Sequence, residues 1–458
     1  MIGNIGLLLG LAALILMALR GVNILVAALL ASLIVGLSNG LTVDGIVLNH
    51  FAFGPLGAFS FAGQFFVLFL SGAIFGKMMA TSGAAMAIAQ FVIDRLGAHR
   101  TLLVTVLVCA ALTYGGVVVF VVIFTMYPLG IALMRESDLP KRLFCGAAAL
   151  GAGTFTMTAL PGTPSIQNVI AANALGTDLF AGILPGLAGA LVMGMGGWLY
   201  LEDQWRRARV RGEGYRANPQ DAAMEKMAPD VRHAPQAVVA VVPLLVVLGS
   251  IIVPRVLVAV GLVGSDTPVV GGVVVFANAQ PIIWPSFALV LGSLCCVLLF
   301  ASLRMKVMEA LSGGANDSIM PLLNTAAVIG FGGVVTQTAG FSAFAQGVIG
   351  LNLPPMLSAA VSVSVVSGIV GSASGGLQIF LQTFAEHYLA MGVAATDLHR
   401  IAAIASGGLD SLPHSGAVIA MLTIMGLRHA EAYRDIFVVT VVVPVIATLV
   451  AIGVAGLG

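Results

Sequence analysis

The chain consists of long apolar runs that are separated by short polar stretches. About 20 apolar residues in a helix cross the hydrocarbon core of a bilayer. The one sizeable polar stretch, 201–236, begins Leu-Glu-Asp-Gln-Trp-Arg-Arg and is predicted to be a linker. The pattern predicts an all-α polytopic membrane protein. Its ten expected spans are 2–19, 22–38, 60–79, 143–176, 179–200, 237–262, 284–302, 316–335, 400–427 and 434–456.

Two further apolar stretches, 101–134 and 355–393, are too long for one helix and contain glycines near their centres. Each divides into two arms of about 12 to 16 residues, which are short for full spans. We predict that both stretches are re-entrant helical hairpins. A pair of ordinary spans at each place is the alternative.

The two halves of the chain share short motifs at an offset of about 252 to 260 residues. In each half a hairpin precedes a span that proline and glycine interrupt, 143–176 in the first and 400–427 in the second. Paired, broken apolar segments of this kind are typical of secondary transporters. We therefore predict a first repeat at 1–200, a linker at 201–236 and a second repeat at 237–458. The shared motifs are Phe75-Gly76 with Phe331-Gly332, Tyr114-Gly115-Gly116 with Ser374-Gly375-Gly376, Asp138-Leu139 with Asp397-Leu398, and Leu160-Pro161-Gly162-Thr163 with Leu412-Pro413-His414-Ser415.

Positive charge orients the predicted spans. Arginines cluster in the linker, and short cytoplasmic segments carry an excess of Lys and Arg. With the linker inside, both termini lie outside, and every Lys and Arg is inside except Arg255 and Arg400. This distribution requires that each hairpin enter and leave on the same face. The two repeats then have opposite orientations, so we predict an inverted repeat.

The composition agrees with a membrane protein. The chain is 59% hydrophobic and 9% charged, with a mean hydropathy of +1.07, whereas soluble proteins contain about 25% charged residues. A formal charge of +1 gives no basis for a nucleic-acid partner. The four cysteines show no metal-ligand spacing, so no metal or cofactor is expected. The N-terminus has no basic region or cleavage site, and we interpret it as a retained first span.

Four backbone breaks are expected to meet near the middle of the bilayer: the first tip (113–116), the first kink (161–165), the second tip (372–376) and the second kink (410–416). Irregular backbone at this depth must be covered by protein or line a water-filled cavity. Each break frees N–H groups at a half-helix N-terminus, where the helix dipole favours an anion. Helix packing at a glycine kink is the alternative. The candidate substrate-binding residues are Thr113, Tyr114, Gly115, Gly116, Gly162, Thr163, Ser165, Asn168, Ser372, Ser374, Gly375, Gly376, Ser411, His414 and Ser415.

No Lys or Arg occurs in these four breaks. Recognition of an anion is therefore expected to come from dipoles and neutral donors. Such a site favours a small ligand with one carboxylate over a di- or tricarboxylate.

Asp410 and His414 are the predicted proton-coupling pair. Ten helical residues cover about 15 Å, so Asp410 falls near the membrane centre if its span begins near Arg400. Ionisable groups at that depth are costly and usually functional, and histidine exchanges protons near neutral pH. The alternative is that Asp410 caps the next half-helix and His414 hydrogen-bonds a freed carbonyl. Asp317 is predicted to be the N-cap of the span at 316–335.

Four segments resemble the gluconate permease (GntP) family: Thr-Tyr-Gly-Gly-Val at 113–117, Leu-Pro-Gly-Thr-Pro-Ser-Ile-Gln-Asn at 160–168, Ser-Gly-Gly-Leu-Asp-Ser-Leu-Pro-His-Ser-Gly-Ala at 406–417, and Tyr-Arg-Asp-Ile-Phe at 433–437. The resemblance covers essentially the whole chain. It implies kinship with the ion transporter superfamily, and hence inverted repeats, re-entrant hairpins, a dimer-forming scaffold and an elevator-type transport domain. It also implies proton-coupled uptake of a hydroxylated monocarboxylate across a bacterial inner membrane.

One motif departs from the gluconate permeases. They carry a His-Val-Asn-Asp-type motif in the second half, which is not found in this chain. The Leu-Asp-Ser-Leu-Pro-His stretch at 409–414 is more similar to the branch that includes 3-hydroxybutyrate permeases. We therefore expect a substrate like 3-hydroxybutyrate ahead of gluconate.

Three other functions are alternatives. Free carbonyls at the kinks could hold sodium, which leaves sodium coupling open. An anion channel would need a continuous pore. Asp410 and His414 with Ser411 or Ser415 could form a hydrolytic set. However, the matching kink of the first half lacks both charges, so a duplicated binding site explains the pattern more simply than an enzyme.

Overall fold

The computed structural model describes residues 2–226, 235–261, 268–350 and 353–457. Helices form the regular structure of these ranges, and no strand occurs in them. The predicted all-α class is confirmed.

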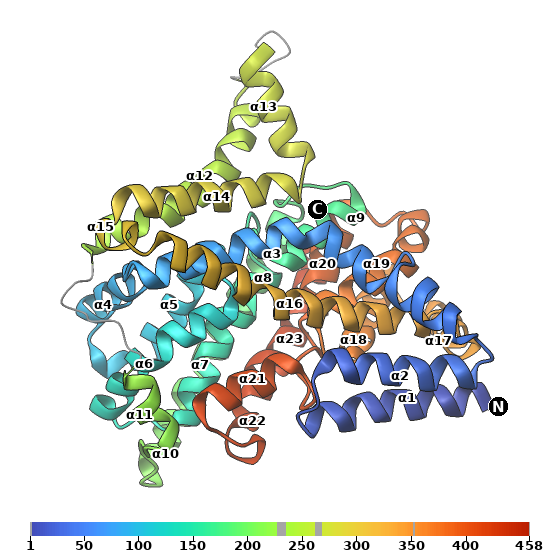
Figure 1. The fold of residues 1–458 in the computed structure, drawn as a ribbon, viewed down its shortest axis with the longest axis horizontal. Coiled ribbons are helices and arrows are strands. Elements are labelled where there is room, and N and C mark those ends of the chain that lie inside the picture. Colours follow the sequence, from blue (N-terminus) through green and yellow to red (C-terminus); the bar gives the residue numbers. More distant parts are fainter. Residues whose placement is uncertain (1, 227–234, 262–267, 351–352, 458) are drawn as a thin grey trace.

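The first half contains twelve helices and helical turns in chain order, coloured blue to green in Figure 1. They are α1 (Ile2–Leu19), α2 (Ile24–Ser38), η1 (Gly45–Ala52), α3 (Ala58–Thr81), α4 (Ala84–Leu96), η2 (Ala98–Arg100), α5 (Thr101–Tyr114), α6 (Val119–Ser137), α7 (Lys141–Gly153), α8 (Phe155–Thr158), α9 (Ile166–Leu175) and α10 (Ile183–Val210).

The remaining helices follow from the linker to the C-terminal region. They are α11 (Pro219–Lys226), α12 (Ala237–Ala259), α13 (Pro268–Ala279), α14 (Ile283–Leu299), α15 (Ala301–Arg304), α16 (Val307–Val335), α17 (Ala339–Ile349), α18 (Pro355–Val370), α19 (Ala373–Ala390), α20 (Ala395–Ser406), α21 (Gly416–Met425), α22 (His429–Phe437), η4 (Val438–Val442) and α23 (Val443–Ala455).

Among the described residues, six continuous helices are long and apolar enough to cross a membrane, and a bent pair at 271–299 raises the number to seven. The ten expected spans exceed this number because several are shorter or divided. α2 has 15 residues. The first broken span separates into α7, α8 and α9, of 13, 4 and 10 residues, and the second into α20 and α21, of 12 and 10 residues. One arm of the first predicted hairpin, α6, is itself among the six.

The helices are interrupted in the regions where glycine and proline concentrate. α5 and α6 are separated at 115–118, α8 and α9 at 159–165, α18 and α19 at 371–372, and α20 and α21 at 407–415. Gly162 and Gly371 have φ of +80° and +64°, a backbone conformation that glycine adopts without steric cost. Proline at positions 161, 164 and 413 removes backbone donors that a continuous helix would need.

α3 and α16 pack against each other through the middle of the molecule, and α1 and α2 form a pair beside α16 (Figure 1). The two helix pairs α5–α6 and α18–α19 lie in different parts of the view, and the two interrupted segments α7–α9 and α20–α21 lie between them. Buried apolar residues connect these elements into one core.

Two expectations about charged residues are corrected. Asp317 is not an N-cap, because α16 begins ten residues earlier at Val307, and its carboxylate instead pairs with Lys77 Nζ at 3.1 Å. Arg400, expected at the outer surface, has no exposed side-chain surface. The linker also contains helical structure, since α10 continues to Val210 and α11 follows.

Candidate functional site

Each tip contacts the kink of its own half. In the first half, the Tyr114 hydroxyl donates a hydrogen bond of 2.9 Å to the carbonyl of Pro161. In the second half, a Cβ added to Gly371 would lie 3.0 Å from Cδ2 and 3.1 Å from Nε2 of His414. The absence of a side chain at Gly371 therefore allows the second tip to lie directly against the His414 ring.

The two halves also contact each other at the kinks. A Cβ added to Gly407 would lie 3.2 Å from Cγ2 of Thr158, so the end of α20 packs beside α8. α9 packs against both α19 and α20. The structure thus connects the four breaks through direct contacts between neighbouring elements.

Asn168 organises the first kink. Its side chain is fully buried, and Nδ2 donates to the carbonyls of Thr163 at 2.8 Å and Leu179 at 3.0 Å. Its Oδ1 accepts from His399 Nε2 at 2.8 Å. The Leu179 carbonyl also accepts the Gly162 N–H at 2.8 Å. These bonds hold the first kink against α20 and against the loop that follows α9.

Several predicted hydroxyl donors already have partners within the fold. The Thr113 hydroxyl donates to the carbonyl four residues earlier, and Ser165 Oγ donates to the carbonyl eight residues earlier at 2.6 Å. Ser372 Oγ accepts the Gly375 N–H at 3.2 Å and caps α19. These side chains stabilise the local backbone as it breaks.

The second kink combines a carboxyl group and an imidazole. Asp410 has the backbone N–H of Ala373 beside its carboxyl group, and Ser411 Oγ donates to its Oδ1 at 3.0 Å. The N-terminus of α19 therefore faces Asp410, an arrangement that favours negative charge. His414 is 8% exposed, and its Nε2 has no hydrogen-bond partner.

The remaining predicted residues lie in the breaks or at the adjoining helix ends. Ser374 and Ser415 are buried, and Gly376 packs against Ser367. Gly116 lies against Pro164 of the first kink, where an added Cβ would be 3.2 Å from Cγ. The full set placed in this way is Gly115, Gly116, Gly162, Thr163, Ser374, Gly375, Gly376 and Ser415.

The described residues contain eight buried side-chain polar atoms without a hydrogen-bond partner. Four of them belong to the second kink or to helices that adjoin the breaks, namely Gln167 Oε1, Ser367 Oγ, Arg400 Nη1 and His414 Nε2, and the others are Trp198 Nε1, Trp205 Nε1, Asn324 Oδ1 and His387 Nε2. Buried polar groups normally have partners, and an unpaired one costs about 1–3 kcal/mol.

Four buried polar residues beside the breaks are not among the site residues predicted from the sequence, namely Gln167, Ser367, His399 and Arg400. Gln167 lies inside the motif at 160–168, so its position was a usable signal. Ser367 lies one turn before the second tip. His399 and Arg400 follow the repeated Asp-Leu pair. Their sequence context is that of ordinary polar residues near a helix end, and only the structure shows that both are fully buried.

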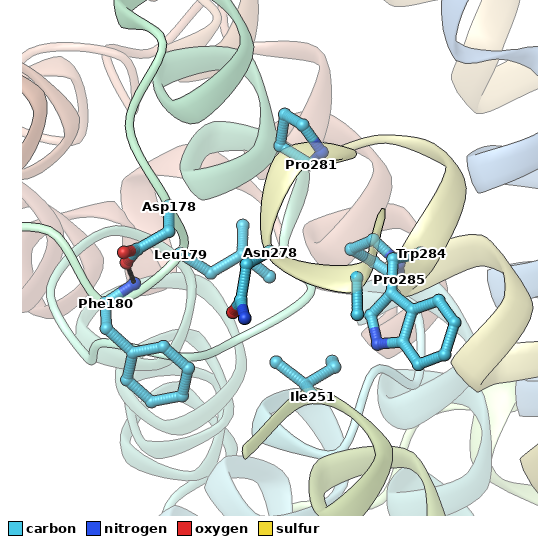
Figure 2. A pocket seen from close by; sticks show the side chains of 9 residues that line it. Asp178, Leu179, Phe180, Ile251, Asn278, Pro281, Trp284 and Pro285 are labelled. Atoms are coloured by element: carbon cyan, nitrogen blue, oxygen red, sulfur yellow. Dashed lines mark hydrogen bonds between the residues drawn. The ribbon is translucent and has the colours of Figure 1, made fainter. Parts of the chain in front are cut away.

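Two cavities lie near the breaks, but no predicted site residue lines either of them. A small one of about 20 Å³ is lined by the loop at 178–180 and by α12 to α14, as Figure 2 shows, with the Phe180 N–H bonded to Asp178 Oδ1 at 2.7 Å. A larger apolar one of about 130 Å³ lies between α1, α16, α17 and the α18–α19 pair. In the described part of the chain, no group of three or more His, Cys, Asp or Glu side chains is arranged to hold a metal.

Comparisons with known proteins agree with the resemblance. The model of the GntP family permeases matches residues 3–409. An uncharacterized transporter of Bacillus subtilis, YxjC, is 38% identical over 401 residues, which are 82% of this chain and 83% of that protein. The high-affinity gluconate transporter of Escherichia coli is 26% identical over 323 residues, 69% of this chain and 66% of that protein.

Solved structures of transporters share the fold. The Alcanivorax borkumensis YdaH transporter has a TM-score of 0.53 at 13% identity and matches 97% of this chain and 98% of its own. Neisseria gonorrhoeae MtrF has a TM-score of 0.50 at 12% identity over 87% of this chain and 82% of its own. These similarities concern the fold alone. Because the family model and the Bacillus subtilis relative both extend over most of the sequence, the chain belongs to the GntP permease family and is a polytopic membrane transporter rather than an enzyme.

Proposed function

We propose that this chain is a proton-coupled symporter that carries a small hydroxy monocarboxylate across the bacterial inner membrane. The observation that carries the proposal is the environment of His414 in the second kink. There a buried imidazole with an unpartnered Nε2 lies against the second tip, four residues from Asp410 and close to the N-terminus of α19.

The substrate class follows from the size and polarity of the breaks and from the relatives. Half-helix ends, hydroxyls and an imidazole suit one carboxylate and a few hydroxyl groups. The Escherichia coli relative is named for gluconate, whereas the Leu-Asp-Ser-Leu-Pro-His stretch resembles the 3-hydroxybutyrate branch. We place 3-hydroxybutyrate ahead of gluconate.

Coupling follows from charge balance. A substrate carboxylate brings one negative charge into a region where an uncompensated charge is costly. A nearby anion favours the protonated form of histidine. A proton on His414 would therefore accompany the substrate, and the net charge of the substrate carboxylate and the imidazolium together would be close to zero.

The proposal includes an architecture. Two inverted repeats, at 1–200 and 237–458, would form an elevator-type homodimer with re-entrant hairpins at 101–134 and 355–393 and with both termini in the periplasm. The shared motifs of the two halves and the matching positions of the four breaks support this arrangement.

Uptake into proteoliposomes tests the function. An imposed pH gradient, acid outside, should drive accumulation of 3-hydroxybutyrate or gluconate, and a sodium gradient alone should not. His414→Ala should abolish the pH-driven accumulation, whereas His99→Ala, which changes an exposed histidine, should preserve it. Accumulation driven by sodium alone would contradict proton coupling, and flux without saturation or counterflow would indicate a channel.

A further inference from the structure

The two halves carry a buried cation at equivalent positions. Asp138-Leu139-Pro140-Lys141 in the first half matches Asp397-Leu398-His399-Arg400 in the second. Lys141 is 6% exposed and Arg400 is 0% exposed. Both positions therefore place a positive charge inside the protein, where a charge is costly unless it is paired.

The two cations differ in how they are neutralised. Lys141 Nζ lies 2.6 Å from the carboxylate of Asp221, which is itself buried. Arg400 forms no ion pair with any carboxylate among the described residues. Its Nε donates to the Ala181 carbonyl at 2.9 Å and its Nη2 to the Leu179 carbonyl at 3.1 Å, while Nη1 has no partner. Carbonyls satisfy N–H groups but supply no net negative charge.

Two glycines of the loop and of α10 provide the space for the Arg400 side chain. A Cβ at Gly182, where φ is +61°, would lie 2.5 Å from Arg400 Cβ, and a Cβ at Gly186 would lie 3.2 Å from its Nε. A larger residue at either position would displace the Arg400 side chain. The buried position of Arg400 therefore depends on these two glycines.

The guanidinium lies at the first kink. The Leu179 carbonyl that accepts from Nη2 also accepts from Gly162 and Asn168. Arg400 also interacts electrostatically with Tyr114, whose hydroxyl bonds the Pro161 carbonyl. The guanidinium is therefore connected to the first kink through the Leu179 carbonyl and lies near Tyr114 of the first tip.

A buried guanidinium without a carboxylate partner requires an anion, and its planar fork matches a carboxylate better than other donors do. We propose that Arg400 supplies the fixed positive charge that binds the carboxylate of the substrate, with Nη1 as the donor. The inference rests on the proposed function and replaces the expectation that only dipoles and neutral donors recognise the anion. In the first half the carboxylate of Asp221 neutralises Lys141. In the second half the carboxylate of the substrate would neutralise Arg400 in the same way.

Binding to purified full-length protein tests this role, with gluconate and 3-hydroxybutyrate as anionic probes and gluconamide and 3-hydroxybutyramide as uncharged ones. Arg400→Gln keeps a donor but removes the charge, and Arg400→Lys keeps the charge but loses the fork. Arg255→Gln is the matched control, because Arg255 lies at the same loop but is neutralised by Asp178. Thermal unfolding without ligand is measured for every variant.

Arg400→Gln should weaken binding of the acids about tenfold or more, since hydrogen bonds to charged groups are the strong ones. Binding of the amides should change less than about threefold, and Arg400→Lys should recover part of the affinity for the acids. The unliganded Arg400→Gln variant is expected to unfold somewhat earlier than the wild type, because the carbonyls of Ala181 and Leu179 lose their guanidinium donors, so the comparison of acids with amides decides the role of the charge. Arg255→Gln should bind like the wild type.

Three results would decide against this inference or separate it from the proposed function. Equal losses of affinity for the acids and the amides would show that Arg400 only holds the loop at 178–182 against α20. If the wild type binds a dicarboxylate and neither hydroxy acid, and Arg400→Gln weakens that binding, the substrate class is wrong and the anion site stands. If no organic anion binds, both are wrong.

Discussion

A buried ion pair fixes the segment of the linker at 213–226 to the rest of the protein. Asp221 is 3% exposed at its side chain and accepts four hydrogen bonds. They come from Lys141 Nζ at 2.6 Å, the Tyr127 hydroxyl at 2.8 Å, the Tyr215 hydroxyl at 2.7 Å and the backbone N–H of Asn218 at 3.0 Å. Through this carboxylate the linker is attached to both α6 and α7.

The same segment reaches the second half. Asn218 Nδ2 donates to the carbonyls of Met425 at 3.0 Å and Gly426 at 3.1 Å, which end α21. Glu213 forms a two-pronged pair with Arg142. Loss of the Asp221 contacts is expected to release this connection locally, without unfolding the helices in the membrane.

The change Asp221→Asn leaves Lys141 buried without a countercharge. Removal of one partner from a buried ion pair costs about 3–5 kcal/mol. Since about 1.4 kcal/mol is a factor of ten, the local opening constant should rise roughly a hundredfold to a few thousandfold. Lys141→Met added to Asp221→Asn removes the unpaired cation and should restore most of the loss.

Hydrogen exchange followed by mass spectrometry measures the opening. Peptides that cover 213–226 should exchange faster in Asp221→Asn by about the predicted factor, and peptides from α1 and α2 should not change. An increase smaller than about threefold would show that the ion pair contributes little to the attachment. An equal increase in every peptide would show that the change destabilises the whole fold.

Two further changes test the site. Gly371→Ala should reduce transport at least about tenfold, because alanine is strained at φ +64° and its Cβ would meet the His414 ring, whereas Gly249→Ala in α12, with open space around it, should transport normally in the same uptake assay. Asn168→Ala should lower the free energy of unfolding by about 1–3 kcal/mol, because His399 and two carbonyls lose their partner, and an unchanged thermal midpoint would contradict this.

The sequence predicted the positions at which helices end, because the causes are local. Tyr114 is followed by Gly-Gly, Val370 by Gly371, and Leu160 by Pro-Gly, and these residues end helices through their own backbone chemistry. The first tip, predicted at 113–116, is observed at 115–118, and the second, predicted at 372–376, is observed at 371–372, so that its last four residues already belong to α19.

The partners of charged residues could not be predicted in the same way. Orientation from charge treats every Arg as a residue of the membrane surface, yet Arg400 is buried against two carbonyls because glycines at 182 and 186 provide space for it. Asp221 lies in a polar stretch of low apolar content, and its burial depends on Lys141, which is 80 residues away. Such contacts follow from tertiary packing, which no local pattern contains.

The titratable groups of the linker segment at 213–226 have shifted pKa values, which determine whether this segment can contribute to the pH dependence of transport. Burial by itself raises the pKa of Asp221, but hydrogen bonds from Lys141 and Tyr215 outweigh it and lower the pKa below its usual 3.8. The Arg142 hydrogen bonds lower the pKa of Glu213. Burial and the bond to Asp221 raise the pKa of Tyr215 from 10.0 to about 12.

These directions determine the pH range over which the linker stays attached. A depressed carboxyl pKa contributes stability above the unfolded value, and that stability is lost as the pH falls through the folded value. A raised tyrosine pKa contributes stability below its unfolded value, which is lost as the pH rises toward about 12. Between roughly pH 5 and 9 all three groups keep their charge state, so the attachment should not respond to pH.

Under the proposed coupling, the pH dependence of transport then arises at the His414 and Asp410 pair of the second kink. Exchange of the peptides at 213–226, corrected for intrinsic rates, should be constant between these limits and increase below about pH 4. Asp221→Asn should retain pH-driven accumulation, although linker exchange is faster. If Asp221→Asn abolished this accumulation and His414→Ala retained it, coupling would reside in the linker and the assignment of the proton to the second kink would be wrong.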